Sequence, residues 1–580
     1  MPYGVLRFGS FELDAENFEL RRAGRRVRLD RTPLELLFFL AERPGKLVTH
    51  KEAVEGVWGE DVFIEAESRL YTAIRKIRQA LGDRPTRPRF LETVARKGYR
   101  FIALPVAARK SGPKKQEPGE RSMLAVLPLE NLSGDPQREY FSDGLTEELI
   151  TELGRLSPRE LGVIARTSVM RFKGTRKSVP EIARELGADY LIEGSARHER
   201  GRVRIAVQLI RAADQSHVWA ESFERPLGDV LRVQADVAAA VAHNIRLKLM
   251  PPQPESSSMD PEVFDYYLRA RFLLDQRTAP AIRRAIGYFE KSLERDPRYA
   301  QAWAGLATCY ATLPITSDAR PLDCFPKTTE TVRRALALDI SLPEAHIASG
   351  IAHFWFDWNW AAAEREFRRA CELNPSDSRA RMFLAHLHSN LGRHGEALKE
   401  IQAAGRLDPF SLIINTHQGQ FLYHARRYAE AQRPLERVLE IAPRFWIARI
   451  IHGLILGVRG RLRKALREFS AGYRYSYGNT FAPALCGYTL GALGNFAAAR
   501  SLLREIERRA RRGYVPPVHP SLVRLGLSES EAALDELERA VEERDVRLAF
   551  LAVEPRWDPL REHSRFEKIS KSVGLPAGIA

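Results

Sequence analysis

The sequence predicts a multidomain chain that joins three fold classes: an α+β domain, then a mixed-sheet α/β domain, then an all-α solenoid. Three observations predict this order. A basic amphipathic helix runs into a hairpin pattern within 66–101, strand and helix patterns alternate over 122–250, and small residues recur every 34 positions after about 260. A chain of 580 residues is also too long for one hydrophobic core, so several domains are expected.

The first domain, predicted over 1–105, is best defined by its basic helix at 66–81. The apolar residues of this helix fall at i, i+4, i+7 and i+11, which places them on one stripe. They are Leu70, Ile74, Ile77 and Leu81. The opposite side is polar and mostly basic, with Arg69, Thr72, Arg75, Lys76 and Gln79 on it and Arg78 at its margin.

The segment after this helix has the pattern of a short basic hairpin. Residues 90–101 alternate apolar and polar side chains around a turn at Lys97-Gly98. Ten Lys and Arg residues stand against three acids within 66–101, a local charge of +7. A helix about 10–12 Å wide fits the major groove of B-DNA, and a flanking basic hairpin can reach the adjacent minor groove. The pattern therefore indicates a domain that reads duplex DNA.

This arrangement resembles the OmpR/PhoB-type winged helix, in the version used by CadC/ToxR-like regulators. The resemblance covers about residues 4–105. It is carried by the segments TPLELLFFLAERPGKLVTHKEAVEGVWG, AIRKIR and FLETVARKGYRF, preceded by the strand segments VLRFGSFELD and FELRRAGRRVRL. The resemblance implies that 66–81 is the recognition helix and that 90–101 is the wing.

The resemblance also implies two sets of DNA contacts. One set matches positions that face bases or phosphates: Ser68, Thr72, Arg75 and Lys76, with Arg69 beside them on the basic face. The other set matches positions that contact the DNA backbone: Trp58, Arg78, Thr93 and Tyr99. Many members carry a basic wing residue where this sequence has Ala95, and two neighbours can substitute for it: Arg96 and Lys97.

A mixed-sheet α/β domain is predicted over 122–250, after a polar Pro/Gly-rich linker at 106–121. Its patterns follow the order βαβαβββα, which is typical of a mixed sheet covered by helices. Ser178 and Glu181 have the spacing of a capping box at the start of one helix. The segments AVLPLENLSGD, FSDGLTEELITEL, VIARTSV, GADYLIEGSAR and HVWAESF resemble the TolB-amino-terminal-like domain. Glu147, Glu148 and Glu152 are spaced as an outward helix face.

The third domain, predicted over 260–580, is a solenoid of paired helices. Small residues recur at a step of 34, namely Ala363, Ala397, Ala431, Ala465, Ala499 and Ala533. A second series keeps the same step: Ala385, Gly419, Gly453, Gly487 and Ser521. Small side chains let paired helices approach closely, and this period resembles that of tetratricopeptide repeats. About eight repeats are expected, followed by a carboxy-terminal cap.

The first helices of such pairs line a concave surface that commonly binds a protein or peptide. Counting from the small residues places eight side chains near this surface. They are Arg379, Met382, His386, Thr416, Gln420, Tyr423, Phe481 and Tyr488. Packing between helices remains an alternative role for each, because a register error of one residue moves a side chain off the face.

Composition narrows the class of function. The chain has 90 Lys and Arg against 74 Asp and Glu, a net charge of +16, which favours polyanionic partners. Its four cysteines lie far apart without paired spacing, which excludes a disulfide framework and the common zinc modules. No catalytic constellation, metal-ligand spacing or cofactor motif stands out, so we expect no catalytic residues, no metal and no cofactor. No apolar run long enough for a membrane span is present, and a cytoplasmic location is expected.

Together these features predict a one-component transcriptional regulator that binds double-stranded DNA through its winged helix. The carboxy-terminal modules would sense a signal or recruit a protein partner, and the protein could act on DNA as a homodimer. An alternative is a cytoplasmic scaffold in which the winged helix binds protein. A third class, an enzyme whose middle domain binds a small ligand, lacks a supporting motif. The basic recognition helix favours the first hypothesis over the second.

Overall fold

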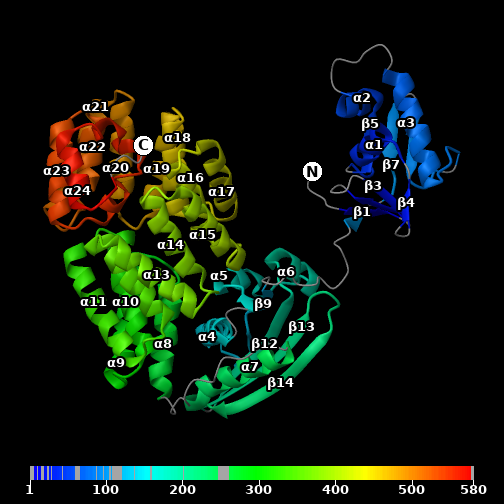
Figure 1. Ribbon diagram of the computed structural model, residues 1–580. Helices are drawn as coiled ribbons and strands as arrows, with labels where there is room; N and C mark the ends of the chain where they lie inside the picture. The colour runs from blue at the N-terminus through cyan, green and yellow to red at the C-terminus, as the bar shows by residue number, and fades with distance from the viewer. Residues whose placement is uncertain are drawn as a thin grey trace. The chain divides into compact units, whose positions relative to one another are not determined.

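A computed structural model describes residues 5–8, 11–14, 19–22, 25–27, 29–41, 43–58, 66–86, 88–95, 97–103, 106–107, 121–135, 138–156, 160–199, 201–245 and 260–576. The chain divides into two compact units, Met1–Pro118 and Gly119–Ala580 (Figure 1). None of the helices in the described ranges combines the length and apolar character that a bilayer crossing requires.

The amino-terminal unit begins with a five-stranded antiparallel sheet. Its order is β4 (Arg25–Val27), β3 (Glu19–Arg22), β2 (Phe11–Asp14), β1 (Val5–Phe8) and β8 (Val106–Ala107). Each of the two predicted strand segments therefore folds as a pair of strands. Strand β8 occupies the first two residues of the predicted linker, because Val106 and Ala107 pair with β1. Residues 108–120 of that linker lie outside the described part of the chain.

Three helices and a second sheet complete this unit. The helices are α1 (Arg31–Ala41), α2 (His50–Trp58) and α3 (Ala66–Leu81), and the sheet order is β5 (Leu47–Thr49), β7 (Gly98–Phe101) and β6 (Leu91–Val94). The predicted basic helix and hairpin are thus confirmed. The apolar stripe of α3 is buried at 0–3 % exposure, as its spacing requires: Leu70, Ile74, Ile77 and Leu81.

Gly98 opens strand β7 where β5 approaches most closely. Its φ of +152° belongs to a region that side chains rarely adopt, and a Cβ there would lie 2.0 Å from the carbonyl oxygen of Val48. Thr49 pairs with Gly98 across the two strands. The wing can therefore join β5 only because residue 98 has no side chain.

The second unit starts with the predicted mixed sheet. The strand order is β11 (Leu161–Val163), β9 (Ser122–Val126), β12 (Tyr190–Glu199), β13 (Arg202–Arg211) and β14 (His217–Pro226), with β10 (Glu130–Asn131) paired to β12. Strands β11, β9 and β12 run parallel, whereas β12, β13 and β14 form an antiparallel meander. The helices are α4 (Glu139–Leu156), α5 (Arg166–Val169), α6 (Val179–Leu186) and α7 (Val230–Asn244). The predicted capping box is present at α6, where the Ser178 N–H donates to Glu181 Oε2 at 2.8 Å.

Eight successive helix pairs follow within 261–542, a range that the structure describes throughout. They are α8 (Pro261–Leu274) with α9 (Ala279–Arg295), α10 (Ala300–Thr316) with α11 (Pro321–Leu338), α12 (Pro343–Ala352) with α13 (Trp360–Leu373), α14 (Ser378–Asn390) with α15 (His394–Leu407), α16 (Leu412–His424) with α17 (Tyr428–Ile441), α18 (Trp446–Val458) with α19 (Leu462–Tyr475), α20 (Phe481–Ala492) with α21 (Phe496–Ala510), and α22 (Val518–Gly526) with α23 (Ser530–Glu542). Figure 1 shows them in order from green to red.

The small residues hold each pair together as their period predicts. The six alanines at the step of 34 are all 0 % exposed: Ala363, Ala397, Ala431, Ala465, Ala499 and Ala533. In the second series, a Cβ at Gly453 would lie 2.4 Å from the Phe469 ring of the paired helix. The close approach of α18 to α19 therefore depends on a missing side chain.

The chain ends with a segment that returns to earlier repeats. It comprises the 3₁₀ helices η5 (Val546–Phe550) and η6 (Pro555–Leu560) and then helix α24 (Ser564–Ser572). The Tyr423 hydroxyl of α16 donates to Glu554 Oε1 at 2.5 Å, and Trp360 Nε1 donates to the Gly574 carbonyl at 2.8 Å. These contacts bring the carboxy-terminal segment against the fifth and third repeats as well as its own neighbour.

The α/β sheet domain and the solenoid share a buried polar junction. Arg271 of α8 pairs with Glu147 of α4, and the Tyr267 hydroxyl donates to Glu148 Oε1 at 2.9 Å. The prediction that Glu147 and Glu148 lie on an outward face is therefore wrong. Helix α8, about 120 residues later in the chain, covers that face. The local spacing of the acids could not predict this contact. The predicted boundary near 250 falls within 246–259, outside the described residues.

Candidate nucleic-acid interface

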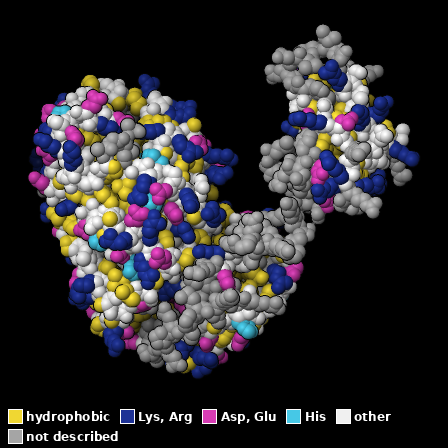
Figure 2. Space-filling model, in the orientation of Figure 1, with side chains coloured by type: hydrophobic (Ala, Val, Ile, Leu, Met, Phe, Trp, Pro, Cys, Tyr) yellow, Lys and Arg dark blue, Asp and Glu magenta, His cyan; other side chains and the backbone are white. Residues whose placement is uncertain are grey.

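The basic face of α3 is open to solvent. Five of the predicted contact residues are exposed on it: Ser68, Arg69, Thr72, Arg75 and Lys76. The buried stripe of α3 packs on α1 and α2, so the packing that holds the helix also turns these side chains outward. Figure 2 shows Lys and Arg side chains on the visible face of this unit. The structure thus brings together the base- and phosphate-facing set that the sequence predicts.

Lys76 and Thr72 of this set have intramolecular contacts. Lys76 Nζ lies 2.5 Å from Asp30 Oδ2, and both side chains are well exposed. An exposed pair of this kind contributes at most about 1 kcal/mol, so a phosphate can compete for the ammonium group. The Thr72 hydroxyl donates to the Ser68 carbonyl at 2.9 Å, within the same helix. The Thr72 hydroxyl oxygen can still accept a hydrogen bond.

Arg78 connects α3 to the wing. Its Nη2 donates to the Leu91 carbonyl at 2.9 Å and to Thr93 Oγ1 at 2.8 Å. The sequence predicts separate contacts of Arg78 and Thr93 with the DNA backbone. In the structure these two residues bind each other, which adds a role for Arg78 in positioning the wing, while its contact with the DNA backbone stays a prediction. Thr93 stays exposed and keeps its predicted place at the surface.

Asp83 fixes the connection between α3 and β6, and sequence patterns gave no sign of it. Its carboxylate is 7 % exposed and accepts the backbone N–H groups of Arg89, Phe90 and Leu91 at 2.7, 3.1 and 2.8 Å. Hydrogen bonds to a charged acceptor are stronger than neutral ones, and three of them define one conformation of this loop. A lone acid between a helix and a hairpin carries no periodic signal that would predict this.

Tyr99 is placed differently from the expectation. It is 2 % exposed and packs beside His50, with ring centroids 5.5 Å apart, and burial raises the pKa of its phenol. A direct contact of Tyr99 with the DNA backbone is therefore corrected to a packing role. The exposed aromatic residue of α3 is Tyr71, at 52 % exposure, which lies edge-on to His50.

Fewer of the predicted DNA contacts can be described in the wing than in α3. Lys97 is exposed at the turn between β6 and β7, as predicted. Arg96 and the side chain of Trp58 lie outside the described residues, so their predicted contacts stay predictions.

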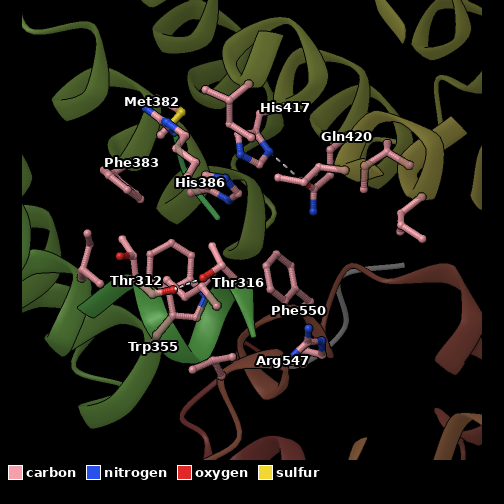
Figure 3. A pocket seen from close by; sticks show the side chains of 18 of the residues that line it. Thr312, Thr316, Trp355, Met382, Phe383, His386, His417, Gln420, Arg547 and Phe550 are labelled. Atoms are coloured by element: carbon pink, nitrogen blue, oxygen red, sulfur yellow. Dashed lines mark hydrogen bonds between the residues drawn. The ribbon is translucent and has the colours of Figure 1, made fainter. Parts of the chain in front are cut away.

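The solenoid contains a second candidate site, a cavity of about 260 Å³ lined by its inner helices and by η5 and η6. Five of the eight predicted concave residues line it: Arg379, Met382, His386, Gln420 and Phe481. Figure 3 shows Met382, His386 and Gln420 around this space, opposite Arg547 and Phe550 of the carboxy-terminal segment. The predicted concave surface is thus partly covered by the chain's own end.

The other three predicted residues do not line the cavity. Thr416 and Tyr423 are 0 % exposed, with the Thr416 hydroxyl bonded to the Leu412 carbonyl and the Tyr423 hydroxyl bonded to Glu554. Their predicted partner-binding role is corrected to packing, because one step along a helix turns a side chain from the groove to the interior. Tyr488 is partly buried beside Gly526 of the next repeat.

Three family models match the chain in the order of its domains. The model described as "Transcriptional regulatory protein, C terminal" matches residues 24–101, and the model of the second domain of HilA/YgeH-like transcriptional regulators matches 120–239. The tetratricopeptide repeat model matches 282–323 and 358–411. The predicted resemblance of the middle domain to the TolB amino-terminal domain is not among these matches and stays a prediction.

Individual relatives cover different shares of the chain. A candidate adenylate cyclase of Rhizobium meliloti (strain 1021) is 35% identical over 249 residues, 42% of this chain and 42% of its own length. The transcriptional regulator HilA of Salmonella typhi is 22% identical over 410 residues, 69% of this chain and 70% of its own. The phosphate regulon regulator PhoB of Rhizobium meliloti is 35% identical over 95 residues, 16% of this chain and 41% of its own. The chain thus spans less than half of the first of these relatives.

The matches agree with the geometry of both units, which place an outward basic helix beside a wing and stack eight helix pairs behind a mixed sheet. The chain therefore contains a winged-helix domain of the OmpR/PhoB type, a HilA/YgeH-like second domain and tetratricopeptide repeats.

Proposed function

We propose that this protein is a one-component transcriptional regulator that acts in the cytoplasm by binding duplex DNA through α3 and the wing. The observation that carries the proposal is the exposed basic face of α3, which includes Arg69, Arg75 and Lys76. This face lies next to the wing, which Arg78 and Asp83 hold in place by hydrogen bonds. A helix held in this way can enter the major groove while the wing follows the backbone.

The proposed contacts divide into two roles. Arg75 lies in the middle of the exposed face and makes no ion pair or hydrogen bond with the described residues, so its guanidinium is available to a guanine edge. Lys76 and Lys97 are placed to meet phosphates, which position the protein without reading sequence. Ser68 and Thr72 offer short hydroxyls at the same surface, which suit either bases or phosphates.

The proposal can be tested on the unit 1–118, which is compact and has its own hydrophobic core. Its affinity for duplex DNA is measured by fluorescence anisotropy over a range of salt concentrations. The double variant Arg75→Ala/Lys76→Ala is expected to lose at least about tenfold in affinity and to flatten the salt slope by about one phosphate contact, that of Lys76.

A matched control removes two positive charges from elsewhere on the same unit. Arg26 on β4 and Arg31 at the start of α1 are 73% and 85% exposed and lie outside α3 and the wing. The double variant Arg26→Ala/Arg31→Ala should change affinity less than threefold. Equal losses in the two doubles would mean that net charge, not the α3 face, governs binding.

The alternative function is a scaffold whose winged helix binds a protein. It predicts that the folded unit 1–118 shifts no DNA even at low salt. The exposed arginines of α3 do not favour it.

Partner binding by the solenoid and a homodimer on DNA also stay proposals. The family match to tetratricopeptide repeats supports a protein or peptide partner, but the concave residues first predicted for it are partly covered by η5 and η6. Dimerisation is checked by sedimentation of the full chain with and without DNA.

We propose no catalytic role, although a candidate adenylate cyclase is among the relatives. Its match covers 42% of either chain, and the family models that match here are those of regulators and repeats. Incubation of the full chain with ATP and Mg²⁺ is expected to yield no cyclic AMP above that of a heat-denatured control.

A further inference from the structure

The cavity of the solenoid lies where its first helices face the returning carboxy-terminal segment. The helices α10, α12, α14, α16 and α18 contribute one side, and η5 and η6 contribute the other. Thr480 at the start of α20 donates its N–H to Asp318 after α10 at 3.1 Å, which ties the seventh repeat to the second. The cavity is therefore a built feature of the unit, held by contacts between distant parts of the chain.

Its walls are suited to an apolar body. Aromatic rings contribute from four elements: Trp355, Phe383, Phe481 and Phe550. Aliphatic side chains of α12, α16 and α18 form much of the remaining wall, with Ile351 and Leu454 among them. An apolar cavity of about 150 Å³ can hold a benzene ring. A volume of about 260 Å³ is therefore large enough for a group of roughly bicyclic size.

Arg547 brings a positive charge to this cavity without an ion-pair partner. Its Nη1 is buried and donates to no acceptor among the described residues, and its guanidinium lies 4.5 Å from the centre of the Phe481 ring. The two nearby acids, Asp545 and Asp318, accept hydrogen bonds from other groups. Asp545 accepts the N–H of Val518 at 3.1 Å, and Asp318 accepts that of Thr480. A buried guanidinium nitrogen normally donates to an acceptor, whereas for Arg547 Nη1 the charges of Asp545 and Asp318 act only from a distance and neither carboxylate accepts its hydrogen bond.

The neighbouring Arg556, in contrast, has an ion-pair partner. Arg556 Nε donates to Glu554 Oε1 at 3.0 Å, and Glu554 also accepts the Tyr423 hydroxyl. Burial acts to raise the pKa of Glu554, but the charge and hydrogen bond of Arg556 outweigh it and lower the pKa to about 2, so that the carboxylate is ionised. Glu554 is thus neutralised by its own partner and is not available to Arg547.

The cavity as a whole carries positive charge. Five arginines and three carboxylates line it, a formal balance of +2. The two histidines that line the cavity, His386 and His417, add no positive charge near neutral pH. Burial lowers the pKa of His417 to about 4 and that of His386 well below its usual value. Both imidazoles are therefore neutral hydrogen-bonding groups, and the Nδ1 of His386 has no partner among the described residues.

From this geometry we propose that the cavity binds a small monoanion with an aromatic or branched aliphatic body, most simply a carboxylic acid, whose carboxylate pairs with Arg547. The apolar body occupies the space between Trp355, Phe383 and Phe550. His386 and Gln420 lie on the opposite side and provide neutral polar contacts (Figure 3). Since Arg547 and Phe550 belong to η5, the bound anion joins the carboxy-terminal segment to the inner helices.

The test uses the full chain and a matched pair of probes, 1-naphthaleneacetate and its neutral isostere 1-naphthaleneacetamide. Affinity is measured by calorimetry and by quenching of tryptophan fluorescence, since Trp355, Trp446 and Trp557 line the cavity. The carboxylate is expected to bind at least about tenfold more tightly than the amide, which corresponds to about 1.4 kcal/mol.

Three variants locate the binding. Arg547→Gln should remove the preference for the carboxylate while leaving the amide affinity within about threefold. Arg504→Gln removes the same charge from an exposed position of α21 outside the cavity and should change neither affinity. Thr312→Phe fills the cavity from α10 and should abolish binding of both probes. Circular dichroism and thermal unfolding establish that each variant is folded.

The outcomes separate the proposal from its alternatives. Equal binding of acid and amide by the native chain would overturn the role of Arg547, and so would a preference that survives Arg547→Gln. Binding that survives Thr312→Phe would place the site elsewhere. If Arg547→Gln does not fold, Arg547→Lys is the second variant, and it should retain a reduced preference. Because no step depends on DNA, failure here is distinct from failure of the proposed function.

Discussion

The Nη2 of Arg78 lies 2.8 Å from Thr93 Oγ1, so the last turn of the recognition helix holds the first strand of the wing. The same guanidinium donates to the Leu91 carbonyl. A DNA-binding surface that consists of a helix and a hairpin needs a fixed angle between them, because each must meet a different groove. Arg78 provides that link from within the protein, which distinguishes it from Arg75 three residues earlier.

Substitution of these two arginines should therefore have different effects. Arg75→Ala is expected to cost about 1–3 kcal/mol in binding and to relax base preference at one position of the site. Arg78→Ala should weaken all sequences alike and also destabilise the unit by about 1–2 kcal/mol, since it removes two hydrogen bonds. Binding to matched and mismatched duplexes, together with urea unfolding, separates the effects. Loss of base preference in Arg78→Ala with stability unchanged would contradict the assignment.

Asp83 should be critical for the stability of the wing. Asp83→Ala removes the acceptor of three backbone N–H groups and is expected to destabilise the unit 1–118 by about 2–4 kcal/mol. Asp30→Ala is the matched control, because it removes an exposed acid whose pair with Lys76 is worth at most about 1 kcal/mol. Urea unfolding of both variants gives the comparison. Similar losses for the two would show that the Asp83 hydrogen bonds do not hold the wing.

The repeat period predicts which glycines tolerate a side chain. Gly453→Ala should destabilise the full chain by about 1–3 kcal/mol, since its Cβ would meet the Phe469 ring at 2.4 Å. Gly405→Ala is a helical control with no atom within 4 Å of the added Cβ, and it should stabilise by about 0.5–1 kcal/mol. Thermal unfolding measures both. Opposite signs are expected, and equal signs would contradict the packing account.

The buried junction between the sheet domain and the solenoid should make stability depend on pH. Burial raises the pKa of Glu148 to about 7, with Glu147 and Glu344 adding to the rise and Arg271 and the Tyr267 hydroxyl opposing it. Since the folded-state pKa lies above the unfolded value of about 4.3, the folded chain holds this proton over a range where the unfolded chain has lost it. The contribution of Glu148 is therefore most favourable below about pH 4 and declines as the pH rises towards 7.

Glu148→Gln removes this titration while keeping an oxygen that can accept the Tyr267 hydroxyl. The variant should be more stable than the native chain above pH 7, by about 1–3 kcal/mol, and the difference should shrink towards pH 5. Glu152→Gln, one turn further along α4, is the matched control. Unfolding measured between pH 5 and 8 tests this, and parallel curves for the native chain and Glu148→Gln would contradict it.

Features with a local signal were predictable from the sequence, and features that depend on distant contacts were not. The stripe from Leu70 to Leu81 and the alternation in 90–101 defined α3 and the wing, and the alanine period defined the helix pairs. Nothing near Glu148 indicates that Tyr267 will cover it from α8. Nothing near Tyr423 indicates that Glu554 will reach it from 131 residues away. The exposed basic face of α3 was therefore predictable, whereas the closure of the concave surface was not.

The measurement that tests the account most directly is selection of duplexes from a random pool by the unit 1–118, followed by titration of the selected duplex at several salt concentrations. The account predicts a defined sequence preference that Arg75→Ala relaxes, and an affinity that falls linearly on logarithmic axes as salt rises. A folded unit that selects no sequence and shifts no duplex at low salt would contradict it.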